Sequence, residues 1–157
     1  MILRPFSIKD VKDVFLYASD AIVTKYLTWP PHDSLSQTEK VVKEFFMDHL
    51  GIFAIELKSE HKCIGAIDLR LRTEHDKASF GYVLNRAYCN RGYTSEALNL
   101  ILNLSFSKLN LNRVESTHYV GNEASGMKYE GTGIQEVKIR GTFYDVIHYG
   151  IFLNFTS

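Results

Sequence analysis

The stretch that decides the fold is Ser79-Phe-Gly-Tyr-Val-Leu-Asn-Arg-Ala-Tyr-Cys-Asn-Arg-Gly-Tyr-Thr-Ser-Glu-Ala97. A β-rich run leads into a loop with Arg91 and Gly92, and a helix begins at Thr94 or Ser95. The first turn of a helix leaves backbone N–H groups unpaired and carries a partial positive charge, so it can hold a phosphate without many basic side chains. Taken alone, the stretch is either an ordinary turn built on Gly92 or an anion site between strand and helix, and no Walker or dinucleotide glycine fingerprint is present.

The segments on either side of this stretch predict a mixed α/β fold around one sheet. Capping-box patterns at Ser7–Asp10 and Ser36–Glu39 precede residues with helical spacing, the second helix running to about Leu50. From Gly51 the hydrophobic period changes to two, which predicts an antiparallel meander before the helix that opens at Ser95. The expected strands are residues 2–6, 52–57, 63–72, 78–84, 113–120, 134–140 and 143–153.

Composition narrows the class of protein. The 157 residues fit one domain, 1–157, with no linker or repeat. Eighteen Lys and Arg balance 18 Asp and Glu, so the broad basic field that nucleic acid binding requires is missing. The two cysteines, Cys63 and Cys89, have no C-x-x-C spacing, which is typical of a reducing compartment. No run of 18 apolar residues and no signal-peptide pattern occurs, so we expect a cytoplasmic protein that does not bind membranes.

Several short motifs occur together in an order that is informative. They are Gly81-Tyr-Val-Leu84, Asn90-Arg-Gly-Tyr-Thr-Ser-Glu-Ala97, Asn112-Arg-Val-Glu115, Asn122-Glu-Ala-Ser125 and Gly126-Met-Lys-Tyr-Glu-Gly131, with Leu3-Arg-Pro-Phe6, Trp29-Pro-Pro-His32 and Ile64-Gly65 before them. In this order and near this spacing, the chain resembles the GNAT N-acetyltransferases, and among them the ribosomal-protein N-terminal acetyltransferases of the RimJ and RimL type. The resemblance covers essentially the whole chain.

The resemblance implies the GNAT acyl-CoA N-acyltransferase fold, a mostly antiparallel sheet that splays between its fourth and fifth strands and is flanked by helices. It also implies acetyl-CoA as the acetyl donor, and it assigns residues to it. Asn122 would meet the donor near the thioester. Ser125 would place a hydroxyl close to the departing sulfur, or it caps a helix. Trp29 lies where the family has acceptor-binding loops, or it is a packing anchor. The pantetheine arm would pair with Tyr82, Val83 and Leu84, and the pyrophosphate would bind the amides of Arg91, Gly92, Tyr93, Thr94 and Ser95.

Three departures from the family pattern bear on the site. The phosphate loop, Cys89 to Thr94, differs at its first and last positions, which matters little where backbone amides bind. Ser79 stands where the branch often has a proton-relaying Glu, so the resemblance assigns no general base. Ser125 is followed at once by Gly126, where relatives have about seven helical residues, roughly 10 Å of helix. Either this helix is absent, or the sequence omits a stretch here; the intact flanking motifs favour the omission.

The candidate general bases are Asp68, Glu115 and His118. Glu115 and His118 are three residues apart in a predicted strand, where they point to opposite faces, so we expect no metal site. Asp68 lies in the apolar run 64–71 and is either a catalytic base facing the cleft or a solvated strand residue. An α-amine is roughly 10 to 15% neutral at pH 7, against about 0.04% for a lysine-like amine. A site without a strong base thus favours an α-amine acceptor.

Together these observations predict an enzyme, an N-acetyltransferase that moves the acetyl group of acetyl-CoA to a primary amine. The preferred acceptor is a protein N-terminal α-amine, attacked directly in a ternary complex, because neither cysteine has a nearby histidine in sequence for a covalent relay. Three alternatives stay open: a small-molecule acceptor such as an amino acid, polyamine or antibiotic; a module that binds acetyl-CoA without transfer; and an interaction domain without a cofactor. A homodimer is suggested only by analogy.

Overall fold

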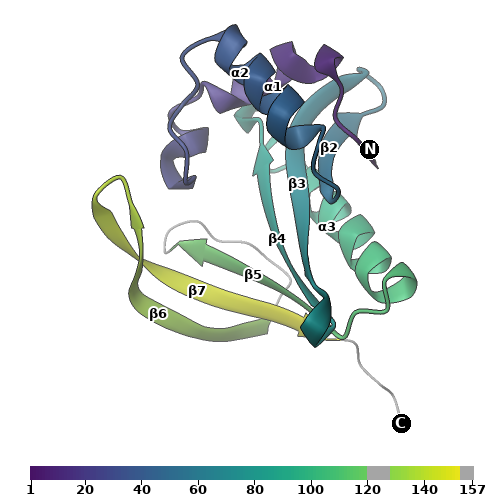
Figure 1. Ribbon diagram of the computed structural model, residues 1–157, viewed down its shortest axis with the longest axis vertical. Helices are drawn as coiled ribbons and strands as arrows, with labels where there is room; N and C mark the ends of the chain where they lie inside the picture. The colour runs from purple at the N-terminus through teal and green to yellow at the C-terminus, as the bar shows by residue number, and fades with distance from the viewer. Residues whose placement is uncertain (120–127, 153–157) are drawn as a thin grey trace. The chain divides into compact units, whose positions relative to one another are not determined.

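The computed structural model describes residues 1–119 and 128–152 (Figure 1). The chain forms two compact units, one from residues 1–68 and 82–100 and the other from residues 69–81 and those after 100. Seven strands pair in the order β1-β2-β3-β4-β5-β7-β6. The pairs β1–β2, β2–β3, β5–β7 and β6–β7 are antiparallel, whereas β4–β5 is parallel. The mixed α/β class and mostly antiparallel sheet predicted from the sequence are confirmed.

The first unit opens with β1 (Ile2–Arg4), a short 3₁₀ turn and α1 (Val11–Ala18). The predicted capping box is present: the backbone N–H of Ser7 donates to the carboxylate of Asp10 at 2.8 Å. The Arg4 guanidinium donates to both oxygens of the same carboxylate, at 2.7 and 2.8 Å, and also pairs with Glu56. Asp10 is only 4% exposed, so this ion pair fixes β1 against the start of α1.

The second helix, α2 (Leu35–Val41), begins before the position predicted from the sequence. Its cap is Ser34, whose hydroxyl accepts the N–H of Gln37 at 3.2 Å, and not Ser36. Ser34 has the extended backbone typical of a cap, whereas Ser36 already lies inside the helix. The helix continues as a π-helical turn, Val42–Phe46, and ends there, short of the predicted Leu50.

Three strands follow, β2 (Ile52–Leu57), β3 (Lys62–Arg72) and β4 (Lys77–Leu84), and they confirm the predicted meander. In the first unit, the two helices lie side by side near one end of these strands in Figure 1. A buried apolar cluster joins α1, the π-helical turn and the strands, and the side chain of Val83 packs against it. The cluster, called here the helix–sheet core, consists of Phe6, Val14, Tyr17, Ala18, Val42, Ala54, Cys63 and Ala66.

The second unit contains β5 (Arg113–Tyr119), β6 (Lys128–Ile139) and β7 (Thr142–Phe152). The parallel β4–β5 pairing covers three residue pairs, Lys77↔Arg113 to Ser79↔Glu115, although β4 runs on to Leu84. β6 and β7 form the long twisted hairpin in Figure 1, turning at Gly141, whose φ is +88°. β6 begins at Lys128 and not at Ile134 as predicted, because its pairing with β7 extends back to Lys128↔Gly150.

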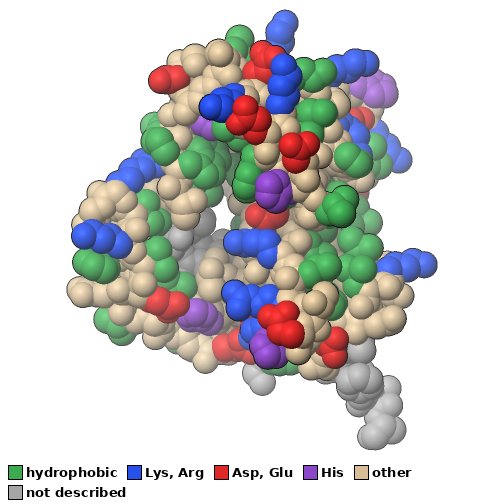
Figure 2. All heavy atoms as spheres, viewed as in Figure 1, with side chains coloured by type: hydrophobic (Ala, Val, Ile, Leu, Met, Phe, Trp, Pro, Cys, Tyr) green, Lys and Arg blue, Asp and Glu red, His purple; other side chains and the backbone are tan. Residues whose placement is uncertain are grey.

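Charged side chains of both signs are intermingled on the face shown in Figure 2, in keeping with the balanced composition. Among residues 1–119 and 128–152, no helix is long and apolar enough to cross a lipid bilayer.

Candidate functional site

The N-terminus of α3 (Tyr93–Asn103) carries a row of unused backbone donors. Its first helical hydrogen bond runs from the N–H of Glu96 to the carbonyl of Gly92, at 3.0 Å. The amides of residues 91–95 have no acceptor within the described part of the chain. Gly92 has a φ of +80°, and no atom lies within 4 Å of the place a β-carbon would occupy. The start of α3 therefore presents five backbone donors without an acceptor, the feature that an anion site at this position requires.

Tyr88 anchors the loop in front of α3. Its hydroxyl donates to the Glu60 carboxylate at 2.7 Å, which raises the pKa of Tyr88 and ties the loop to the β2–β3 turn. The Arg91 guanidinium lies 5.6 Å from the centre of the Tyr88 ring, and the Lys62 ammonium lies 5.9 Å from it. Two cations thus lie near the Tyr88 ring, and one of them, Arg91, belongs to the segment with the free amides.

The end of β4 is tied closely to β3. The carbonyl oxygen of Ile64 accepts the N–H of Asn85 at 2.8 Å. A β-carbon on Gly65 would lie 2.4 Å from the carbonyl oxygen of Val83, so only glycine permits this approach. The contacts with β3 thus fix the backbone at the end of β4. This end contains Tyr82, Val83 and Leu84, which are predicted to meet the pantetheine arm, and it belongs to the same unit as the free amides of residues 91–95.

A cavity of about 470 Å³ lies within the first unit. Its walls come from α1, the Trp29–His32 segment, α2 and the π-helical turn, and most of them are apolar. The rings of Trp29 and His32 have their centres 5.1 Å apart. Trp29, predicted to bind the acceptor, thus lines a space of ligand size. The lining residues are Val14, Tyr17, Ala18, Trp29, Pro30, His32, Gln37, Lys40, Val41, Glu44, Phe45 and Phe46.

His32 is buried in the wall of this cavity and its protonation is set by Thr38. The His32 Nδ1 lies 2.8 Å from the Thr38 Oγ1, which itself donates to the carbonyl of Ser34 at 3.2 Å. The threonine proton is therefore already used, so Nδ1 must carry the imidazole proton and Nε2 keeps a lone pair. Burial lowers the pKa of His32, against a smaller opposing effect of Asp33, and favours the neutral ring.

Sequence reasoning gave His32 no chemical role, because it falls in a turn. The environment of His32 is set by its contact with Thr38. That contact depends on how α2 packs, and no spacing in the sequence predicts it. The Nε2 of His32 makes no hydrogen bond within the described residues. It is also not among the buried atoms lacking a partner, a group that contains only the Tyr17 hydroxyl in the described part of the chain. The free nitrogen thus keeps some accessible surface, on a residue that lines the cavity.

The three candidate bases lie in different surroundings. Burial opposes ionisation of Glu115, but hydrogen bonds from Arg113 (3.0 Å) and Lys77 outweigh it and lower its pKa, so Glu115 serves as an ion-pair partner. Asp68 is half-buried in β3 opposite Ile52. His118 pairs with Ile147 in the β5–β7 ladder. Within the described ranges, no group of three His, Cys, Asp or Glu side chains is arranged to hold a metal ion.

Two predicted residues, Asn122 and Ser125, lie outside the described residues, as does the Ser125–Gly126 junction. The cysteines lack the environment of a nucleophile. Cys63 is buried, which raises its pKa to about 12. Cys89 is exposed, yet partial burial raises its pKa also. Both therefore remain thiols at neutral pH.

Comparison with known proteins now adds to this geometry. Residues 1–135 match the model of the acetyltransferase (GNAT) domain family. The uncharacterized N-acetyltransferase YnaD of Bacillus subtilis is 30% identical over 96% of this chain and 92% of its own. The GNAT-family acetyltransferase of Bacillus anthracis has a TM-score of 0.86 at 27% identity, covering 96% of this chain and 93% of that one.

One further solved structure shares the fold at lower identity. The spermidine N-acetyltransferase of Vibrio cholerae, in complex with CoA and spermine, has a TM-score of 0.79 at 22% identity, covering 96% of this chain and 94% of that one. The family match over most of the chain agrees with the free amides at α3 and with the β3–β4 geometry. The chain belongs to the acetyltransferase (GNAT) family and is an acetyl-CoA-dependent N-acetyltransferase.

Proposed function

We propose that the protein acetylates primary α-amines, taking the acetyl group from acetyl-CoA by direct transfer in a ternary complex. The observation that carries this proposal is the row of free amides at residues 91–95, opened by Gly92 and flanked by Arg91. These amides suit the pyrophosphate of acetyl-CoA, because an anion at a helix N-terminus meets both the unpaired donors and the helix dipole. The edge formed by Tyr82, Val83 and Leu84 is proposed to hold the pantetheine arm.

The chemistry requires a neutral amine, a donor for the tetrahedral oxyanion and a proton for the departing thiolate. A backbone N–H near Val83 or Leu84 is the proposed oxyanion donor. Ser125 is the proposed proton donor to the thiolate, Asn122 the proposed contact near the thioester, and Asp68 the proposed base. Glu115 is held by two cations, which leaves no strongly basic carboxylate there. An α-amine, partly neutral at pH 7, needs the least help.

The class of amine acceptor distinguishes this proposal from polyamine acetylation. The Vibrio cholerae protein has CoA and spermine bound, and a polyamine carries several positive charges that call for several carboxylates. Of the residues lining the cavity beside Trp29, Glu44 is the carboxylate, and Lys40 stands near it in sequence with the opposite sign. This lining favours an α-amine of a peptide or amino acid over a polyamine. From the resemblance to the RimJ and RimL type, we further propose that the acceptor is a protein N-terminus and that the protein forms a homodimer.

Acetyl-CoA binding measured by calorimetry tests the donor site. Gly92→Glu places a side chain and a negative charge against the free amides, so binding should be lost. Gly141→Glu is the matched control: Gly141 also has a positive φ (+88°) and open space around it, but lies in the β6–β7 turn. If both variants bind acetyl-CoA as the wild type does, the amides of α3 are not the pyrophosphate site.

Transfer itself is tested by CoA release with a panel of peptides, amino-acid amides and polyamines. Turnover with α-amines supports the proposal. Tight acetyl-CoA binding without CoA release from any amine would instead identify a binding module that has lost transfer. Turnover confined to polyamines would contradict the acceptor class.

A further inference from the structure

The cavity between α1 and α2 is a mostly apolar enclosure whose lining includes two polar rings, His32 and Tyr17, and the Tyr17 hydroxyl has no hydrogen-bond partner among the described residues. Most of its walls are aliphatic or aromatic, and its volume of about 470 Å³ lies in the range of small-molecule sites. The charged residues of its lining, Lys40 and Glu44, both come from the side of α2 and the π-helical turn. Such a space suits a flat apolar group better than a polycation.

His32 lines the cavity, and its Nε2 makes no hydrogen bond among the described residues. The His32 Nδ1–H donates to the Thr38 hydroxyl, which donates in turn to the Ser34 carbonyl. These two hydrogen bonds hold the ring in one tautomer, with the lone pair on Nε2. A neutral imidazole nitrogen with a lone pair accepts hydrogen bonds and cannot donate them. A polar atom of an occupant that meets Nε2 must therefore be a donor, such as a phenol O–H or an indole N–H.

The cavity also shares packing with the proposed donor strand. Three of its lining residues, Val14, Tyr17 and Ala18, belong to the helix–sheet core against which Val83 packs. Val83 is one of the residues proposed to hold the pantetheine arm. The cavity and the end of β4 thus adjoin the same buried cluster within the first unit.

We propose that this cavity binds the side chain of the acceptor, that this side chain is aromatic, and that it donates a hydrogen bond to His32 Nε2. The acceptors are then α-amines of tyrosine or tryptophan type, as free amides or at the start of a peptide. The statement that the aromatic amine is the acetyl acceptor rests on the proposed function. Its binding in the cavity, through a hydrogen bond to His32, does not.

The test uses L-tyrosinamide and L-phenylalaninamide, which differ by one hydroxyl, in the absence of acetyl-CoA. Trp29 is the single tryptophan of the chain and lines the cavity, so its fluorescence, excited beyond the tyrosine absorption, reports occupancy directly. Both amides should bind, tyrosinamide about 3- to 10-fold more tightly, which is the effect of one net hydrogen bond. No fluorescence change with either amide at millimolar concentration would overturn the proposal.

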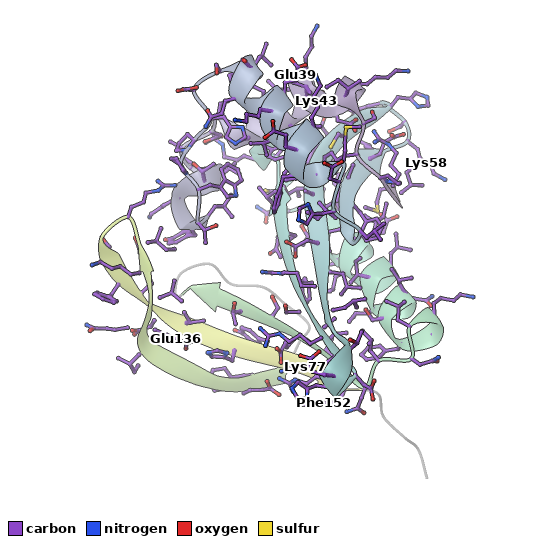
Figure 3. All side chains as sticks on the ribbon, in the orientation of Figure 1. Glu39, Lys43, Lys58, Lys77, Glu136 and Phe152 are labelled. Atoms are coloured by element: carbon purple, nitrogen blue, oxygen red, sulfur yellow. The ribbon has the colours of Figure 1, made fainter. Side chains whose placement is uncertain are left out.

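Two variants isolate the hydrogen bond. In His32→Asn the amide nitrogen can still donate to Thr38, but nothing replaces Nε2, so the preference for tyrosinamide should fall to within about 2-fold. Thr38→Val leaves no acceptor at Nδ1, which frees the tautomer and should weaken the preference as well. Glu39→Gln is the control, because Glu39 pairs with Lys43 on the outside of the same helical segment and does not line the cavity (Figure 3). An unchanged preference in both test variants would exclude His32 as the acceptor of the bond.

CoA release then tests the acceptor assignment separately. Tyrosinamide should be turned over in preference to spermidine. Turnover of spermidine but not of bound tyrosinamide would overturn the assignment. If neither acetyl-CoA nor CoA binds, while the amides bind with the expected His32 dependence, the proposed function fails and the aromatic site stands.

Discussion

Gly65 and Val83 approach each other so closely between β3 and β4 that a β-carbon on Gly65 would lie 2.4 Å from the Val83 carbonyl oxygen. It would also lie 3.0 to 3.1 Å from atoms of Leu84. Both neighbours include backbone atoms, which cannot rotate away as the tip of a side chain can. The end of β4, where the donor is proposed to bind, is therefore positioned by the absence of a side chain on β3.

Gly65→Ala should consequently impair both stability and donor binding. The methyl group must displace the β4 backbone, at a cost of about 1 to 3 kcal/mol of unfolding free energy, and the acetyl-CoA affinity should fall with it. Urea unfolding and calorimetry measure the two effects. Gly141→Ala strains a positive φ without meeting any neighbour, so it should lose stability and keep its affinity. Equal affinities in wild type and Gly65→Ala would contradict the positioning role.

Removing Arg4 should be costly, because Asp10 would remain buried without its cation. Arg4→Met is expected to lower the unfolding free energy by about 3 to 5 kcal/mol at neutral pH. Arg4 is only partly exposed, and the Asp10 side chain is 5% exposed, so solvent screening is weak. Chemical denaturation measures the loss. A change below about 1 kcal/mol would mean that the pair behaves as an exposed one.

The same carboxylate predicts a pH dependence. Burial raises the pKa of Asp10, but the Arg4 and Ser7 hydrogen bonds outweigh it and leave the pKa below its ordinary value. The ionised form thus stabilises the folded state fully above the unfolded pKa of about 3.9, and this contribution is lost as the pH falls through the folded pKa. In Asp10→Asn, stability should be lower at pH 7 and should depend less on pH below about 4. Unfolding curves at several pH values decide this.

Tyr17→Phe should leave stability unchanged or raise it by about 1 kcal/mol. The Tyr17 hydroxyl is buried without a hydrogen-bond partner among the described residues, and removing such a group relieves a desolvation cost. Thermal unfolding provides the measurement. Tyr88→Phe is the contrasting variant, because it loses the hydrogen bond to Glu60, and its melting temperature should fall. A clear loss of stability in Tyr17→Phe would show that the hydroxyl has a partner after all.

The burial of His32 predicts a second pH effect at milder pH. Burial lowers its folded pKa, so near pH 6 the unfolded chain binds more protons at this residue than the folded chain. The contribution of His32 to stability is complete above its unfolded pKa of about 6.5 and declines as the pH falls toward the folded pKa. His32→Asn should therefore show a flatter stability profile between about pH 5 and 7. A profile identical to that of the wild type would show that His32 protonates equally well in both states.

Local rules predicted the parts of the fold that local interactions determine. The Ser7–Asp10 capping box is formed by atoms four residues apart or closer, and it is confirmed. The turn at Gly92, with its positive φ, and the start of α3 at Tyr93 were also predicted from local signals, to within two residues. The β-rich apolar runs predicted the strands of the meander, although β3 is buried on both faces from Cys63 to Ile67.

Where the structure depends on contacts between residues distant in sequence, the predictions were wrong or none was made. The start of β6 was placed at Ile134 because its ladder with β7 is irregular: the register shifts near Gly131 and again after Gly133, which interrupts the period of two. The capping box was placed at Ser36–Glu39, whereas the cap is Ser34, which has an extended backbone and accepts the N–H of Gln37. The His32 tautomer follows from a contact with Thr38 that no periodicity encodes.

The contrast between the two cysteines has a practical consequence. Cys63 is 1% exposed, whereas Cys89 is exposed and stands three residues before Gly92. A thiol-reactive dye should thus attach to the folded protein at one place, beside the loop in front of α3. Such a label would report on the donor end of the first unit while tryptophan emission reports on its cavity. The wild-type chain thereby offers two separate optical channels, with no cysteine to add or remove.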